Sequence, residues 1–180
     1  MDTFSHGLWA GALAKGLNKR EGKRHVNVWA TALWGVFPDL LAFTIPFVFI
    51  MWSVAFGGLE LSQFAGHHPP LVEPAGKSSA WVFSLTSALY NIGHSLIIFS
   101  IVFFGTWAYF KQARLELLGW LLHILMDIPT HSYAFFPTPV FWPLLDWKFD
   151  GISWGQLWFM VLNYSCLLLV YALLSYRKKV

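Results

Sequence analysis

The sequence carries little charge and almost no cysteine. Asp, Glu, Lys and Arg make up 12% of the 180 residues, whereas 57% are hydrophobic and 19% are aromatic. This balance is too apolar for a soluble domain and indicates an integral membrane protein. The single cysteine, Cys166, lies in an apolar run, so no disulfide can form within one chain and we expect an inert packing thiol.

Two further signals are missing. A signal peptide places basic residues before its apolar core, but here the first apolar stretch, residues 4–14, precedes the charges, so we expect it to be retained. The net charge is only +3 and each basic cluster stands beside an apolar run. We therefore expect no nucleic-acid partner.

Apolar runs long enough to cross a bilayer, about 20 residues each, alternate with polar connections. We predict an all-α, polytopic membrane helix bundle of about five helices, four of them long or spanning, in one domain covering residues 1–180. The predicted helices are 3–15, 26–57 (kinked at Pro38 and Pro46), 80–110, 115–128 and 154–176. The stretches 58–79 and 129–153 are predicted to be non-helical.

Lys and Arg are concentrated in alternate connections. They occur at 15–24, 111–114 and 177–179, whereas the other two connections hold only Lys77 and Lys148. The positive-inside rule then predicts a bacterial-type inner (plasma) membrane protein with its basic loops and C-terminus in the cytoplasm.

The other connections should lie on the outer side. Residues 129–153 combine aromatic residues with prolines, which predicts an interfacial loop that acts as a gate or substrate platform, or as a simple anchor. His67 and His68 precede two prolines and are expected in the other outer loop, away from any site.

Six residues that membrane interiors normally exclude lie in or at the ends of the apolar runs. Placing such a group in lipid costs at least about 2.5 kcal/mol, so each is a functional candidate, and all are of types that bind divalent metals. They are His6, Asp39, His94, His123, Asp127 and His131. Helical rise places the first five about 14 to 26 Å from the nearest basic connection, between mid-membrane and the outer interface.

The strongest local motif is His123-x-x-x-Asp127. Residues four apart share one face of a helix, so both side chains can reach a common ion, or they form a buried ion pair without a metal. His131 joins this face only if the helix continues past Pro129.

The remaining candidates have alternatives in packing. Asn91 is expected to orient the ring of His94, or both are polar groups that join helices. Asp39 could compensate for the kink at Pro38, and His6 could be a packing residue on a glycine-containing helix face.

Short motifs across residues 5–155 resemble the YdjM-like membrane-bound metal-dependent hydrolases. They are Ser5-His6-Gly7, Pro38-Asp39, Gly93-His94-Ser95-Leu96, the run 119–127 and Phe141-Trp142-Pro143-Leu144. The resemblance implies that His6, Asp39, His94, His123 and Asp127 are metal ligands. Leu41 and Leu89 stand where the family often has an acid and a histidine, which departs from a full two-metal pattern.

The resemblance implies a membrane-bound metal-dependent hydrolase. The His-x-x-x-Asp-x-x-x-His spacing of 123–131 is also similar to part of the zinc-dependent phospholipase C site, so we expect a lipid phosphoester as substrate, near the outer half of the bilayer. Zinc is the expected ion because the ligands are N and O without thiolate, and Asp39, Asp127 or His131 is the candidate general base. The alternatives are metal-ion or proton transport through the same cluster, and a structural subunit.

Overall fold

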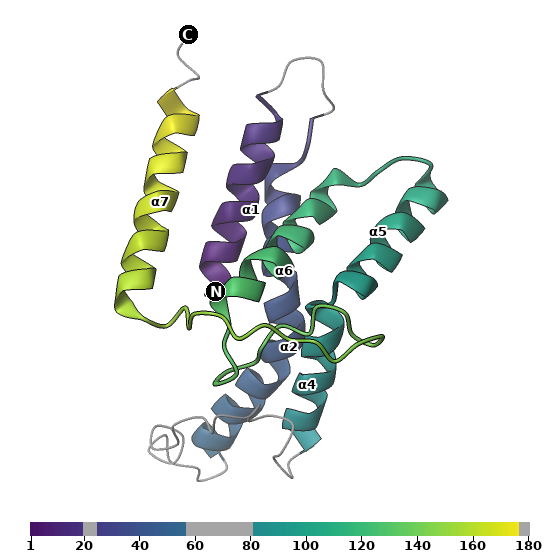
Figure 1. The fold of residues 1–180 in the computed structure, drawn as a ribbon, viewed down its shortest axis with the longest axis vertical. Coiled ribbons are helices and arrows are strands. Elements are labelled where there is room, and N and C mark those ends of the chain that lie inside the picture. The colour runs from purple at the N-terminus through teal and green to yellow at the C-terminus, as the bar shows by residue number, and fades with distance from the viewer. Residues whose placement is uncertain (20–24, 57–80, 177–180) are drawn as a thin grey trace.

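The computed structural model describes residues 1–19, 25–56 and 81–176. The regular secondary structure in this part of the chain is helical (Figure 1). Its elements are α1 (Thr3–Leu17), α2 (Val28–Phe56), α4 (Trp81–Gly93), α5 (Leu96–Phe110), the short 3-10 helix η1 (Leu115–Leu117), α6 (Leu118–Thr130) and α7 (Leu157–Tyr176). Within these ranges the only β pairing is an isolated bridge between Ser132 and Phe135. The all-α prediction is confirmed for these residues, whereas His67 and His68 lie outside them.

Two helices, α2 and α7, are long and apolar enough to cross a membrane. A third candidate span consists of two helices, α4 and α5, which meet at a bend of 56°. The described residues therefore contain two or three candidate spans, as expected for a membrane protein. Helices α1 and α6 are shorter, with 15 and 13 residues respectively.

The break between α4 and α5 corrects the prediction of one helix over 80–110. The carbonyl of Gly93 accepts a hydrogen bond of 2.6 Å from Trp120 Nε1. Ser95 is extended, with φ −94° and ψ 128°, and its hydroxyl accepts from the first amides of α5 as an N-cap. His94 therefore lies at a helix break and not within a continuous span.

The end of α6 decides where His131 lies. Pro129 lies in the last turn of the helix, where its missing amide leaves the carbonyl of Leu125 without a helical donor but does not end the helix. The amide of His131 still donates to the carbonyl of Asp127 at 3.0 Å. The helical spacing of residues 123, 127 and 131 is therefore kept, which was the condition for His131 to join the motif.

Close backbone packing holds α1, α2 and α6 together. A Cβ atom on Gly35 of α2 would lie 2.6 Å from the Cβ of Ala10 in α1. A Cβ on Gly119 of α6 would lie 2.1 Å from the carbonyl oxygen of Thr31 in α2. Glycine is required at both crossings, as is common where membrane helices pack closely.

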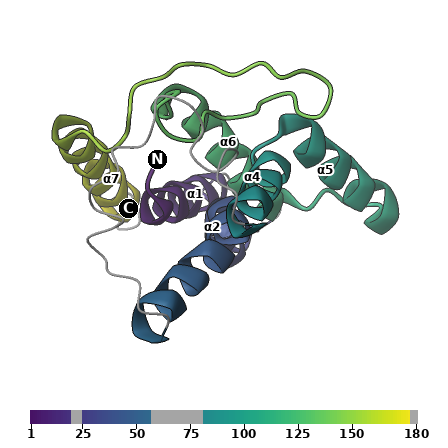
Figure 2. The ribbon, with the colours of Figure 1, turned by 90° about the horizontal axis from the view of Figure 1, so that it is seen from below.

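Residues 131–156 connect α6 to α7 without regular secondary structure, in agreement with the prediction for most of 129–153. Figure 2 shows this segment passing the α4–α5 junction before it returns to α7. The amide of Leu96 donates to the carbonyl of Val140 at 2.9 Å, and the hydroxyl of Ser95 donates to the carbonyl of Trp142. The segment thus satisfies polar groups at the helix break.

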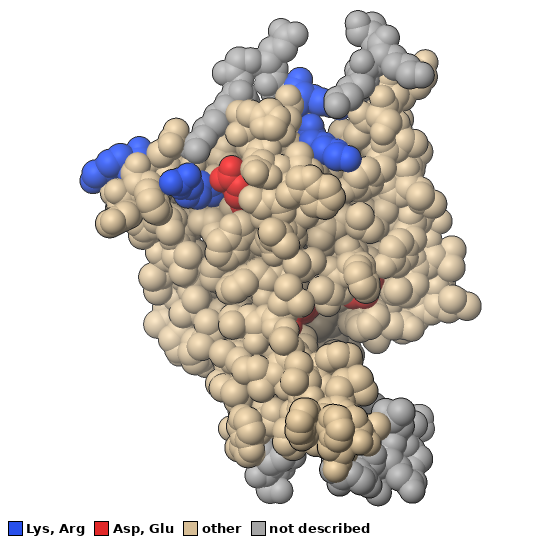
Figure 3. Space-filling model, turned by 180° about the vertical axis from the view of Figure 1, so that it is seen from behind, with Lys and Arg blue, Asp and Glu red and all other residues tan. Residues whose placement is uncertain are grey.

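Except for Lys148, the described basic side chains gather at one end of the molecule. Lys15 and Lys19 lie at the end of α1, and Lys111 and Arg114 follow α5. Figure 3 shows Lys and Arg over the upper part of one face, with one acidic area beside them and smaller, recessed acidic areas lower down. Two connections predicted to share one side of the membrane therefore lie at the same end.

We predict that Gly119→Ala destabilises the protein, because the added Cβ would overlap the carbonyl of Thr31 and force the helices apart. Overpacking of this kind costs about 1–3 kcal/mol. Thermal unfolding in detergent measures the loss. Gly105→Ala is the matched control, since a Cβ at Gly105 meets nothing within 4 Å; equal melting temperatures for the two variants would contradict the packing described here.

Candidate metal centre

The structure brings together all six ionisable residues singled out in the sequence. Each is buried, with an exposed fraction between 0% and 6%. They come from α1 (His6), α2 (Asp39), the α4–α5 break (His94), α6 (His123 and Asp127) and the residue after α6 (His131). Residues far apart in the chain thus form one polar cluster inside an apolar bundle.

Four members of the cluster have the spacing of a metal site. Asp39, His94, His123 and Asp127 each offer one ligand atom, and these atoms lie within 4.8 Å of one another. The Nε2 atoms of His94 and His123 are 3.0 Å apart. They lie 3.5 and 3.1 Å, respectively, from Asp127 Oδ2, and 3.6 and 3.7 Å from Asp39 Oδ1. Ligands at about 2.0–2.1 Å from a tetrahedral ion stand about 3.4 Å apart. The four residues could therefore hold a metal ion.

Main-chain carbonyls fix the protonation of both imidazoles. His123 Nδ1 donates to the carbonyl of Gly35 at 2.7 Å, and His94 Nδ1 donates to that of Tyr90 at 3.0 Å. Because a carbonyl can only accept, each Nδ1 carries a proton, and in the neutral form of either ring Nε2 keeps a lone pair. Tyr90, and not Asn91 as the sequence predicts, thus orients the ring of His94.

The centre of the four-residue group consequently contains only electron-pair donors. Two Nε2 lone pairs face each other, and two carboxylates stand beside them. Such atoms repel one another in a buried setting of low dielectric constant. A cation at the centre would convert each repulsion into an attraction.

Asp127 connects this group to the rest of the cluster through its second oxygen. Oδ1 lies 2.9 Å from His6 Nε2 and 3.4 Å from His131 Nε2, and it accepts a hydrogen bond from the amino nitrogen of Met1. That amino nitrogen is also 2.9 Å from His131 Nε2. The Asp127 carboxylate therefore interacts with ionisable groups on both sides.

Several atoms at the centre have no hydrogen-bond partner among the described residues. His6 stacks on His123 with ring centroids 3.7 Å apart, and both of its nitrogens are unpartnered, since its contact with Asp127 Oδ1 is close but not aligned as a hydrogen bond. Asp127 Oδ2 is also unpartnered. Each such atom costs about 1–3 kcal/mol, a cost that a bound cation would offset at Asp127.

Phe136 and Thr3 complete the site, and neither was singled out in the sequence. His131 Nδ1 donates to the carbonyl of Phe136 at 2.8 Å, and the hydroxyl of Thr3 donates to Asp39 Oδ2 at 2.7 Å. Thr3 stands one helical turn before His6, a spacing that could have indicated its role. A main-chain carbonyl such as that of Phe136 leaves no signal in a sequence.

No family model, curated protein or solved structure matches the chain. The resemblance to the YdjM-like family therefore rests on the sequence motifs alone.

We predict that the purified protein contains a divalent metal and that His123→Ala lowers its metal content at least tenfold, because one ligand and its carbonyl-oriented lone pair are lost. Elemental analysis by mass spectrometry measures the content. His25→Ala is the matched control, since His25 is exposed and outside the cluster. Equal metal in the wild type and His123→Ala would rule out the site.

We also predict that Thr3→Val weakens metal binding by about tenfold while the protein still folds, since loss of a hydrogen bond to a metal-binding carboxylate typically costs 10- to 100-fold in affinity. The hydroxyl of Thr3 donates to the Asp39 oxygen that does not face His94 and His123. Competition with a chelator of known affinity measures the change. Unaltered affinity would mean that Asp39 needs no such support.

Proposed function

We propose that this chain is a membrane-bound metal-dependent hydrolase related to the YdjM-like family, with Asp39, His94, His123 and Asp127 as ligands of one divalent ion. The observation that carries the proposal is the facing pair of Nε2 lone pairs beside two carboxylates. Two imidazoles and two carboxylates suit zinc. When bound, such an ion would have to take a water as a further ligand beside these four; it would then lower the pKa of that water towards about 7 and polarise the scissile bond.

His131 is the proposed general base. The carbonyl of Phe136 holds its Nδ1 proton, so Nε2, which faces the amino nitrogen of Met1 at 2.9 Å, would accept a proton from the attacking water once that amino group moves away. The resulting imidazolium would lie 3.4 Å from Asp127 Oδ1, whose negative charge stabilises it. Asp39 and Asp127 are assigned as ligands, which leaves His131 as the base among the three residues considered from the sequence.

A lipid phosphoester is the proposed substrate class. The cluster is enclosed by helices with large exposed apolar side chains, and a bound cation would attract a phosphate group. The exposed aromatic ring of Phe135 lies beside the cluster, with its centroid 6.3 Å from that of His131. A lipid could present its head group here while its chains stay in the bilayer.

The proposed topology places the basic end in the cytoplasm and the metal centre nearer the outer side. It is supported by the gathering of Lys and Arg at one end (Figure 3) and by the place of His6 near the start of α1 and of Asp127 near the end of α6, away from the basic ends of these helices. A head group reaching the cluster would then enter from the outer leaflet.

Transport of an ion through the cluster is less well supported. The helical residues between the cluster and the basic end, 7–14, 28–38, 96–110 and 118–122, contain no His, Asp, Glu, Lys or Arg. Pumps and transporters rely on chains of such residues to carry charge across the bilayer. A cluster without a continuation suits local chemistry better.

We predict that His131→Gln lowers kcat at least about 100-fold, the lower range of general-base catalysis, while metal content is unchanged because His131 is outside the ligand group. The assay measures head-group or phosphate release from vesicles containing phosphatidic acid, phosphatidylglycerol or phosphatidylethanolamine, with His25→Gln as the control. No release from any of these lipids by metal-loaded protein, or release that survives His123→Ala, would refute the proposal. Metal flux into the vesicles without release would favour transport.

A further inference from the structure

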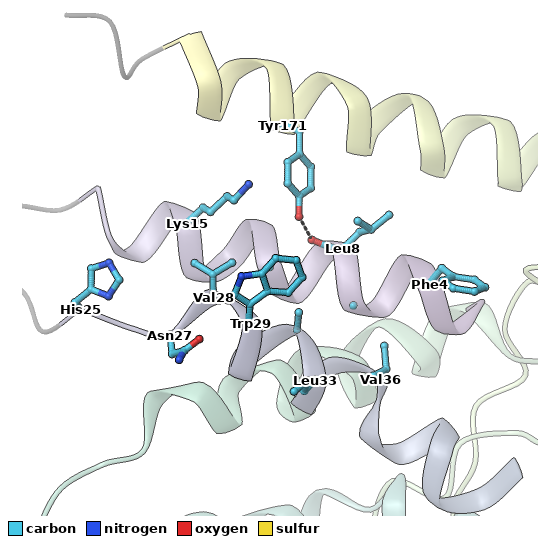
Figure 4. Close-up of a pocket in the computed structure, with 13 residues that line it drawn as sticks. Phe4, Leu8, Lys15, His25, Asn27, Val28, Trp29, Leu33, Val36 and Tyr171 are labelled. Atoms are coloured by element: carbon cyan, nitrogen blue, oxygen red, sulfur yellow. Dashed lines mark hydrogen bonds between the residues drawn. The ribbon is translucent and has the colours of Figure 1, made fainter. Parts of the chain in front are cut away.

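A long groove lies between α1, α2 and α7 (Figure 4). Its volume is about 980 Å³, and it extends along α1 from Phe4 to Lys15. The α1 and α2 residues on its floor include Gly7, Gly11 and Ala32, which have little or no side chain to fill the space. The small residues where α1 and α2 cross therefore create the groove, which is separate from the candidate metal centre.

The dimensions of the groove fit one acyl chain. Eleven residues of helix at about 1.5 Å each give about 17 Å, close to half of the roughly 30 Å hydrocarbon thickness of a bilayer. Leu8, Val28, Trp29 and Leu33 make its walls apolar along most of this length. The polar lining residues Lys15, His25 and Asn27 lie together at one end, as Figure 4 shows.

That polar end is positively charged. A second cavity of about 330 Å³ is lined by Lys15 and Lys19 and shares Lys15 and His25 with the groove. Lys15 Nζ lies 4.6 Å from the ring centroid of Tyr171, and Lys19 Nζ donates to the carbonyl of Leu174. Among the described residues, no carboxylate pairs with either lysine within 4.0 Å.

We infer that this groove binds one anionic phospholipid, with an acyl chain along the apolar walls and the phosphate at Lys15 and Lys19. Lys15 and Lys19, which pair with no carboxylate among the described residues, supply the charge that an anionic head group complements. They lie at the basic end of the molecule, where the cytoplasmic leaflet has its head groups in the proposed topology. The lipid would contact α1, α2 and α7 at once, so it would tie α7 to the rest of the bundle.

The first test uses charge variants. The intact protein is purified in mild detergent, supplied with phosphatidylglycerol or phosphatidylcholine, and examined by native mass spectrometry. The wild type should retain one phosphatidylglycerol in preference to phosphatidylcholine. The double variant Lys15→Gln/Lys19→Gln should bind phosphatidylglycerol about 25-fold more weakly, from about fivefold per lysine, whereas the control Lys111→Gln, at the same end but outside the groove, should bind normally.

The second test fills the groove. Ala32→Phe places a ring on the groove floor and should abolish lipid retention, whereas Ala108→Phe, on the exposed surface of α5, should not. Equal retention of both lipids, or of phosphatidylglycerol by all charge variants, would overturn the inference, because it would mean nonspecific annular lipid. Retention by a folded Ala32→Phe protein would overturn it as well; if that variant aggregates, the lysine variants decide. Neither test requires a bound metal or hydrolysis, so their outcome is independent of the proposed function.

Discussion

The candidate metal centre depends on three hydrogen bonds from imidazole Nδ1 atoms to main-chain carbonyls. His94, His123 and His131 each donate in this way, to Tyr90, Gly35 and Phe136 respectively, and each therefore directs an unprotonated Nε2 towards a carboxylate. Buried polar groups need such partners, and a fixed tautomer prepares an imidazole for binding a cation. The three carbonyls belong to α4, α2 and the segment after α6, so the arrangement exists only when these elements are packed together.

The polar backbone groups at the break between α4 and α5 also need hydrogen-bond partners. A membrane interior offers no water to satisfy free backbone groups, so a broken helix must be compensated by protein. Trp120 donates a hydrogen bond to the carbonyl of Gly93, and Ser95 caps α5. The carbonyl of Val140 accepts a hydrogen bond from the first amide of α5. These contacts also anchor the segment that carries Phe136 and thereby position His131. The helix break and the non-helical segment thus stabilise each other and the centre between them.

Much of the fold and the identity of the polar cluster could be predicted from the sequence. Long apolar runs predict helices, and ionisable residues within them, such as Asp39 and Asp127, are conspicuous because burying them is costly. The break at Gly93 was not predicted, although the polar stripe of Ser87, Asn91 and His94 ends there and Ser95 is a residue type that begins helices. The carbonyl partners were hidden, because every residue has a carbonyl and only tertiary packing decides which of them meets an imidazole.

The first helix links the metal centre to the lipid-facing surface. Its N-terminal turns carry His6, and the neighbouring Ser5 accepts a hydrogen bond of 2.7 Å from Asn163 in α7. Nearer the basic end, the hydroxyl of Tyr171 donates to the carbonyl of Leu8 at 2.9 Å, on the wall of the groove. Because α7 is attached to α1 at both levels, a displacement of α7 would move the turn that places His6 against Asp127. The attachment of this last helix is therefore part of what positions the metal centre.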